Sequence, residues 1–134
     1  MHQPNLATYV ILYHHSEYKA YAGMIYLIQA HATKEQIEEM LETLGSYIKL
    51  AVDIERGILA GGGEYHADCE AVLLENGSKQ VDILGADWYP LTQDVGYESL
   101  INIRPRQNNR SMEIQAPVTR ERVDRIVQQL LGEL

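Results

Sequence analysis

The stretch Leu59–Gly77, LAGGGEYHADCEAVLLENG, decides how the middle of this chain folds. Up to Glu70 its polar and apolar residues alternate, as in a half-buried strand. The alternation ends at Ala71, where a continuous apolar run rich in alanine and leucine begins, and Asp68 and Glu70 then fall in a first helical turn, where acidic residues are favoured. We therefore predict a helix over 66–76, ended by an asparagine–glycine pair.

The helical interpretation determines which side chains can act together. On a helix, His66 shares one face with Cys69 and Glu70, at spacings of three and four residues. Three consecutive glycines immediately precede this helix, where backbone N–H groups are free and the helix dipole is positive. The sequence thus predicts an anion-binding loop formed by Gly61, Gly62 and Gly63.

Two further helices have clear starting signals. Thr33 and Gln36 form a capping box in front of a helix predicted over about 34–44. Thr119 is expected to cap a second helix over about 120–132, whose apolar residues form one stripe. Both helices are expected to pack on a sheet.

Strand patterns occupy most of the remaining sequence. They predict strands at 24–29, 47–54, 81–90, 98–104 and 111–115, with a short hairpin after the second of these. Helices and strands mixed in this order, with short connections and one crossover from Met24 to Ile54, predict an α+β fold with a mainly antiparallel sheet and three helices.

The first part of the chain follows the pattern less well. Residues 1–23 contain four of the nine tyrosines and no sustained period of either kind. We expect them to form an N-terminal extension outside a single α+β domain at 24–134. The alternative, an ordered N-terminal element whose tyrosines cover the domain, is left open.

Composition and charge narrow the classes of function. The chain of 134 residues has a formal net charge of −8, which argues against nucleic acid or an anionic membrane as a partner over its whole surface. Cys69 has no partner for an internal disulfide, and the start has neither a basic leader nor an apolar run long enough for a signal core or membrane span. These features predict a cytoplasmic protein.

Three segments carry a resemblance to a known family. HADCEAVLLENGSKQ, GADWYP and SLINIRPRQNNRSMEIQ resemble the signature segments of a family of small prokaryotic proteins classed only as a domain of unknown function. The resemblance extends from about Met24 to the C-terminal helix and leaves residues 1–23 outside. It implies kinship but no reaction, cofactor or partner.

A second cluster, RPRQNNR, reverses the local charge of this acidic chain. Arginine forks match phosphate and carboxylate groups, so this loop is a candidate anion clamp; ordinary surface ion pairing and turn formation are the alternative. We expect the clamp to meet the glycine loop and bind a small anionic ligand. His66 would be the catalytic proton-transfer group, oriented by Glu70, and the clamp residues would be Arg104, Arg106 and Arg110.

Other kinds of site and function are weighed against this hypothesis. A metal site from His66, Cys69 and Glu70 lacks the second paired motif of familiar zinc sites, and a buried structural role is expected for Cys69. The sequence identifies no cofactor. A non-enzymatic interaction module, a homodimer included, and local RNA contact through the arginine loop are the competing functions, the latter disfavoured by the net charge.

Overall fold

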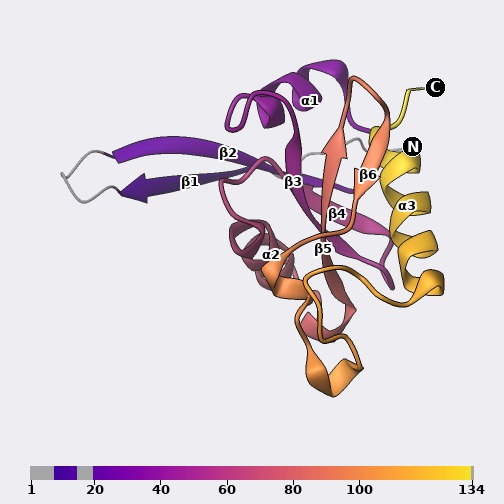
Figure 1. Cartoon of the computed structure of the whole chain (residues 1–134). Helices are drawn as coiled ribbons and strands as arrows, with labels where there is room; N and C mark the ends of the chain where they lie inside the picture. Colours follow the sequence, from indigo (N-terminus) through magenta and orange to yellow (C-terminus); the bar gives the residue numbers. More distant parts are fainter. Residues whose placement is uncertain (1–7, 15–19, 134) are drawn as a thin grey trace.

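The computed structural model describes residues 8–14 and 20–133, with side chains from residue 24 on. It confirms the α+β class, with three α-helices and an antiparallel sheet (Figure 1). The elements are β1 (Thr8–His14), β2 (Ala20–Ile28), α1 (Lys34–Leu41), β3 (Ile48–Asp53), β4 (Ile58–Gly61), α2 (His66–Glu75), β5 (Ile83–Tyr89), β6 (Asp94–Gly96) and α3 (Pro117–Leu131), with short 3₁₀ helices η1 (Gln80–Asp82), η2 (Leu100–Asn102) and η3 (Pro105–Gln107).

Two crossover connections build the sheet, whose strand order is β1-β2-β4-β3-β5-β6. Helix α1 connects β2 to β3 past β4, and α2 connects β4 to β5 past β3. The helices cover both faces: α1 and α3 pack over one apolar cluster, and α2 packs over the other. Figure 1 shows α2 and α3 on opposite sides of the sheet. The domain therefore has three layers.

Strand β5 contributes side chains to both faces of the sheet in turn, because successive side chains of a strand point to opposite sides. Ala86 and Trp88 belong to the cluster beneath α1 and α3, whereas Ile83 packs in the cluster beneath α2. Asp87 contacts the first residue of α2, His66. Asp87 therefore faces the α2 side of the sheet, whereas its neighbour Trp88 faces the side of α1 and α3.

The expected capping box at Thr33 is confirmed, with both reciprocal bonds to Gln36 present. The expected start of the last helix is wrong. Helix α3 begins at Pro117, with Ala116 at the N-cap, because proline at a first helical position already has a helical φ and lacks the N–H that a cap would satisfy. Thr119 lies inside the first turn.

The strands predicted at 98–104 and 111–115 are wrong. The first segment contains η2, and the second contributes one isolated bridge, Glu113 with Glu98. The physical reason is the side chain of Asn102, which satisfies backbone groups of β5 that a neighbouring strand would otherwise satisfy. The sequence analysis also missed β6, which is only three residues long.

At the N-terminal end, β2 begins at Ala20, earlier than predicted, and β1 pairs with it. The expectation that residues 1–23 lie outside the core stays a prediction, and residues 1–7 and 15–19 lie outside the described part of the chain.

In the described part of the chain, none of the helices has the length and apolar character needed to span a membrane.

Candidate functional site

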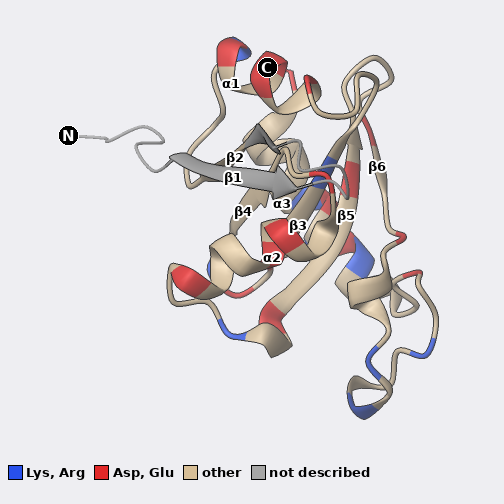
Figure 2. Cartoon of the chain, turned by 90° about the vertical axis from the view of Figure 1, so that its left-hand side faces the viewer, with Lys and Arg blue, Asp and Glu red and all other residues tan. Residues whose placement is uncertain are grey.

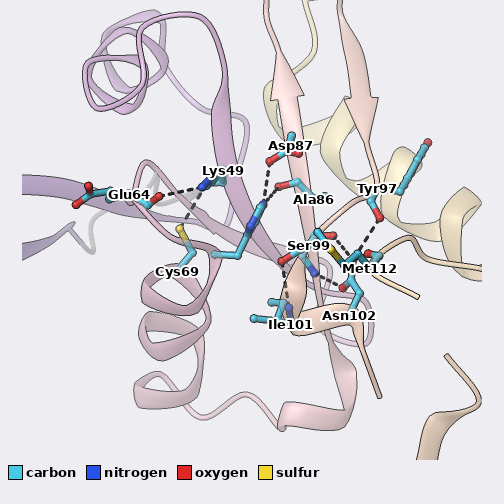
Figure 3. A network of polar contacts seen from close by, with 12 residues as sticks. Lys49, Glu64, Cys69, Ala86, Asp87, Tyr97, Ser99, Ile101, Asn102 and Met112 are labelled. Carbon is cyan, nitrogen blue, oxygen red and sulfur yellow. Dashed lines mark hydrogen bonds and ion pairs between the residues drawn. The ribbon is translucent and has the colours of Figure 1, made fainter. Parts of the chain in front are cut away.

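The candidate site centres on a pair of side chains, His66 and Asp87. His66 is the first residue of α2, and its Nε2 lies 2.8 Å from Asp87 Oδ1 and 3.1 Å from the backbone oxygen of Ala86. Figure 3 shows both acceptors side by side on β5. Since both partners only accept hydrogen bonds, Nε2 carries the proton. The pair therefore fixes the histidine tautomer.

The other ring nitrogen of His66 is left open. Nδ1 has no hydrogen-bond partner in the part of the chain that the structure describes, and it is not among the buried side-chain atoms there that lack one. It is therefore free to bind a ligand or a proton as far as the described residues are concerned. In the neutral imidazole this nitrogen has a lone pair, while Asp87 stabilises the positive charge that appears when Nδ1 takes up a proton.

A cation lies on the neighbouring strand. Lys49 of β3 is the register partner of Asp87 of β5, so both side chains project on the α2 face. Lys49 Nζ donates to the backbone oxygen of Glu64 at 3.1 Å and lies 5.7 Å from the centre of the Tyr65 ring. These contacts hold the ammonium group beside the start of α2.

A cavity of about 370 Å³ opens at this point, and we call it the His66 cavity. That volume lies within the range of small-molecule sites. The hydroxyl of Ser99 contributes a polar group; its Oγ accepts from the backbone N–H of Ile101 at 3.3 Å, which leaves its own O–H to donate. The lining includes Lys49, Tyr65, His66, Ser99, Leu100 and Met112.

Asn102 anchors the segment that forms one wall of this cavity. Its Oδ1 accepts from the backbone N–H of Gly85 at 2.8 Å. Its Nδ2 is within hydrogen-bond distance of the backbone oxygens of Gly85 (3.0 Å), Tyr97 (3.3 Å) and Met112 (3.2 Å). Figure 3 shows this network next to Ser99 and Ile101. Gly85 has to be glycine here, since a Cβ would lie 2.5 Å from the Ser99 side chain.

A family model described as "Protein of unknown function (DUF5674)" matches residues 26–130. The chain belongs to this family. The DUF5674 match includes the His66 cavity, the Asn102 network and the arginine loop, and it confirms the kinship expected from the three sequence segments. No curated protein and no solved structure matches the chain significantly.

In this DUF5674 protein, the glycine triplet lies in the core. Gly61, Gly62 and Gly63 are all buried. Gly62 has a φ of +106°, a Cβ there would lie 2.5 Å from the backbone oxygen of Met24, and its N–H donates to the backbone oxygen of Lys49. Close packing and a left-handed backbone therefore account for these glycines. Gly62 has no free N–H with which to cradle an anion.

Arg104 and Glu70 form a mostly buried ion pair at 2.8 Å, with side chains 14% and 12% exposed. Arg104 Nη1 also donates to the backbone oxygens of Gln80 and Ile83 at 2.6 Å each. Burial lowers the pKa of Arg104, and Glu70 opposes that shift. Glu70 therefore faces Arg104, and Asp87 holds the position beside His66 that the sequence analysis gave to Glu70.

The other two arginines lie on the exposed loop, where basic residues gather (Figure 2). Arg106 lines a second cavity of about 670 Å³, the arginine cavity, which shares Leu100 and Ile101 with the His66 cavity. Arg110 lines neither of these two cavities. Among the described residues, no hydrogen bond joins the glycine triplet to the three arginines. The arginine loop therefore lies next to the His66 cavity, whereas the glycine triplet is part of the packed core.

Sequence reasoning missed Lys49, Asp87 and Ser99. Lys49 and Asp87 are polar residues that interrupt otherwise buried, apolar strands, and this interruption was the available signal. Their pairing requires the register between β3 and β5, which connects distant parts of the chain.

Cys69 is expected to be inert in the folded protein. It is buried, its Sγ contacts the backbone oxygen of Lys49 at 3.4 Å, and burial raises the pKa of the thiol to about 12. Because the thiolate is the reactive form, a thiol reagent at pH 8 should label the native protein very slowly and the unfolded protein fast. Rapid labelling of the native protein at pH 8 would contradict this, with a free-cysteine peptide as the rate control.

A metal centre finds no support in the described residues. No group of three or more His, Cys, Asp or Glu side chains there is arranged to hold a metal ion.

Proposed function

We propose that this DUF5674 protein binds a small anionic molecule in the His66 cavity. The observation that supports this most directly is the His66–Asp87 pair, which fixes the proton on Nε2 of a histidine that lines a cavity beside a lysine. The ligand class and the role of His66 are those expected from the sequence. The binding groups, however, are Lys49, His66 and Ser99 instead of the glycine triplet.

The chemistry of these groups defines the ligand further. Lys49 and the hydroxyl of Ser99 are donors that suit a carboxylate or phosphate oxygen. Nδ1 of neutral His66 accepts a proton from an O–H or N–H of the ligand, and Asp87 stabilises the imidazolium that results. The best candidates are therefore small acids with an added hydroxyl or amino group, or phosphate monoesters. Any reaction in this cavity would begin with proton transfer to or from Nδ1.

The charges around the cavity set its selectivity. Glu98 also lines it and Asp87 contacts His66, so Lys49, Glu98 and Asp87 sum to one negative charge when His66 is neutral. Uptake of a proton by His66 brings this sum to zero, which removes the net repulsion that a bound anion would meet. Binding is expected to be coupled to proton uptake, which is measurable as a buffer-dependent heat of binding.

The test is a thermal-shift screen against phosphate, phosphate monoesters, hydroxycarboxylates and amino acids, followed by calorimetry on the hits. A ligand at a hundred times its Kd should stabilise the protein by about 2.7 kcal/mol, a shift of several degrees in a domain of this size. His66→Gln and Lys49→Met should remove the shift. Arg106→Ala, in the neighbouring arginine cavity, is the matched control and should retain it.

Two outcomes would overturn the proposal. If Arg106→Ala abolishes the shift and His66→Gln retains it, the ligand binds in the arginine cavity. If no compound in the panel stabilises the wild type while His66→Gln alone lowers its midpoint, the His66–Asp87 pair serves only to attach α2 to β5.

A specific observation favours a second function, an interaction module. Val81, Leu100 and Ile103 are 59%, 71% and 43% exposed and line the arginine cavity together. Exposed apolar residues that gather in this way are typical of partner surfaces. A homodimer through this surface should dissociate in the variant Leu100→Asp, as measured by light scattering.

We further propose that the protein is cytoplasmic, since its only cysteine is an unpaired thiol.

A further inference from the structure

Strands β1 and β2 form an arm at one edge of the sheet. They pair along the whole of β1, from Thr8 opposite Tyr26 to His14 opposite Ala20. β2 in turn pairs with β4 over 26–28 alone, so the rest of β2 has β1 as its one strand partner in the described part of the chain. Figure 1 shows the two strands extending beyond the helices and the rest of the sheet.

The outer edge of β1 is a surface to which a further strand could add. β1 is the edge strand of the six-stranded sheet, and no strand pairs with its outer side among the residues that the structure describes. Its sequence, TYVILYH, contains no lysine, arginine, acidic residue or proline, with which proteins usually protect a strand edge. A two-stranded ribbon alone is also only marginally stable in water. Another strand on this side would therefore stabilise the arm and cover its edge.

The sequence of β1 indicates which strand this is, because it reads nearly the same in both directions. A valine and a leucine flank the central residue, Ile11, and a tyrosine lies beyond each of them. Two copies of β1 aligned antiparallel about Ile11 therefore place Tyr9 opposite Tyr13 and Val10 opposite Leu12. Aromatic and aliphatic cross-strand pairs of this kind stabilise a sheet. The best complement to β1 is thus β1 of a second copy.

We propose that the protein forms a symmetric dimer in which β1 pairs antiparallel with β1 of a second copy, centred on Ile11. The two six-stranded sheets then join into one continuous sheet. A two-fold axis through Ile11 makes the interface isologous, with the same residues contributed by both copies. Each chain has a formal net charge of −8, whereas β1 has no acidic or basic side chain other than a histidine. Contact through the arms therefore joins two acidic chains where like-charge repulsion is weak.

Light scattering of the full chain tests this pairing. The wild type should have twice the mass of one chain. Ile11→Lys places two like charges directly opposite each other, which destabilises strand pairing, and should reduce the mass to that of one chain. Ile11→Val keeps an uncharged β-branched residue and, as the matched control, should remain dimeric. Both variants should keep the circular dichroism of the wild type, because β1 pairs with β2 alone in the described chain.

Cysteine cross-linking tests the register and does not require Ile11→Lys to fold. Ile11→Cys places two thiols on the axis, with Cα atoms about 4.5–5.5 Å apart, so mild oxidation should form a covalent dimer. Thr8→Cys alone should not cross-link, because each Thr8 lies opposite His14 of the second copy and about 20 Å from the other Thr8. A mixture of Thr8→Cys and His14→Cys should cross-link. The wild type, whose Cys69 is buried, gives the background.

The proposal is overturned if the wild type has the mass of one chain or if a folded Ile11→Lys variant remains dimeric. A dimer that Leu100→Asp dissociates and Ile11→Lys retains would instead use the exposed residues of the arginine cavity. Cross-linking of Thr8→Cys as fast as that of Ile11→Cys would contradict the register. None of these outcomes depends on ligand binding in the His66 cavity.

Discussion

Arg104→Ala is expected to lower the free energy of unfolding by about 3–5 kcal/mol, because removing one partner of a buried ion pair leaves the other charge unpaired. The partner left behind is Glu70, whose carboxylate is mostly buried between α2 and the arginine loop. The backbone oxygens of Gln80 and Ile83 also lose their donors. Urea denaturation of the variant and the wild type measures the difference.

Arg106→Ala is the matched control for this prediction. Arg106 lies two residues further along the same loop and is exposed, so its loss should change the free energy of unfolding by less than about 0.5 kcal/mol. Glu70→Gln should cost less than Arg104→Ala, since the amide oxygen still accepts from Arg104. Equal, small effects of the two arginine substitutions would show that Arg104 does not hold the fold together and would return it to the list of ligand-binding residues.

Asn102→Asp is expected to lower the free energy of unfolding by about 3 kcal/mol, because a buried carboxylate would replace an amide donor. The size of the side chain hardly changes. Asn102 is 1% exposed, and its Nδ2 faces three backbone oxygens. The aspartate oxygen that takes its place would either repel those oxygens or bind a proton. The loss should therefore shrink as the pH falls and the carboxyl group becomes neutral.

Asn109→Asp provides a comparison with the same chemistry in a more exposed place. Asn109 Nδ2 also faces three backbone oxygens, those of Asn102, Ser111 and Glu113, but this side chain is only half-buried. Its substitution should cost clearly less, because water can solvate the new charge. If both variants lose the same free energy, burial is not the reason that Asn102 matters.

Local signals predicted much of the fold. The capping box at Thr33 and the apolar run that begins at Ala71 depend only on neighbouring residues. They predicted helices at about 34–44 and 66–76, and the structure has them at 34–41 and 66–75. The segment 98–104 could not be predicted in this way. Its pattern resembles a strand, but on the edge of β5 away from β3 the partner of Gly85 is the side chain of Asn102. A tertiary contact of this kind leaves no periodic signal.

The candidate site was predicted in part. His66 was identified from its type and its place at a helix start, and it lies in a cavity. Its partner was misassigned because Glu70 is close in sequence, whereas Asp87 is close only in the folded sheet. The role of Gly62 could not be predicted either. A glycine required by a positive φ and close packing looks the same in the sequence as a glycine of an anion-binding loop.

The most direct test of the central claim is a long-range ¹H–¹⁵N NMR spectrum of the histidine side chains, recorded with and without phosphate and a hydroxycarboxylate. The spectrum of His66→Gln assigns the His66 signals. We predict that neutral His66 carries its proton on Nε2 and that Nδ1 is the ring nitrogen most strongly shifted by the anion. A proton on Nδ1, or an Nδ1 signal unchanged by these anions while the Arg106 amide shifts, would contradict the account.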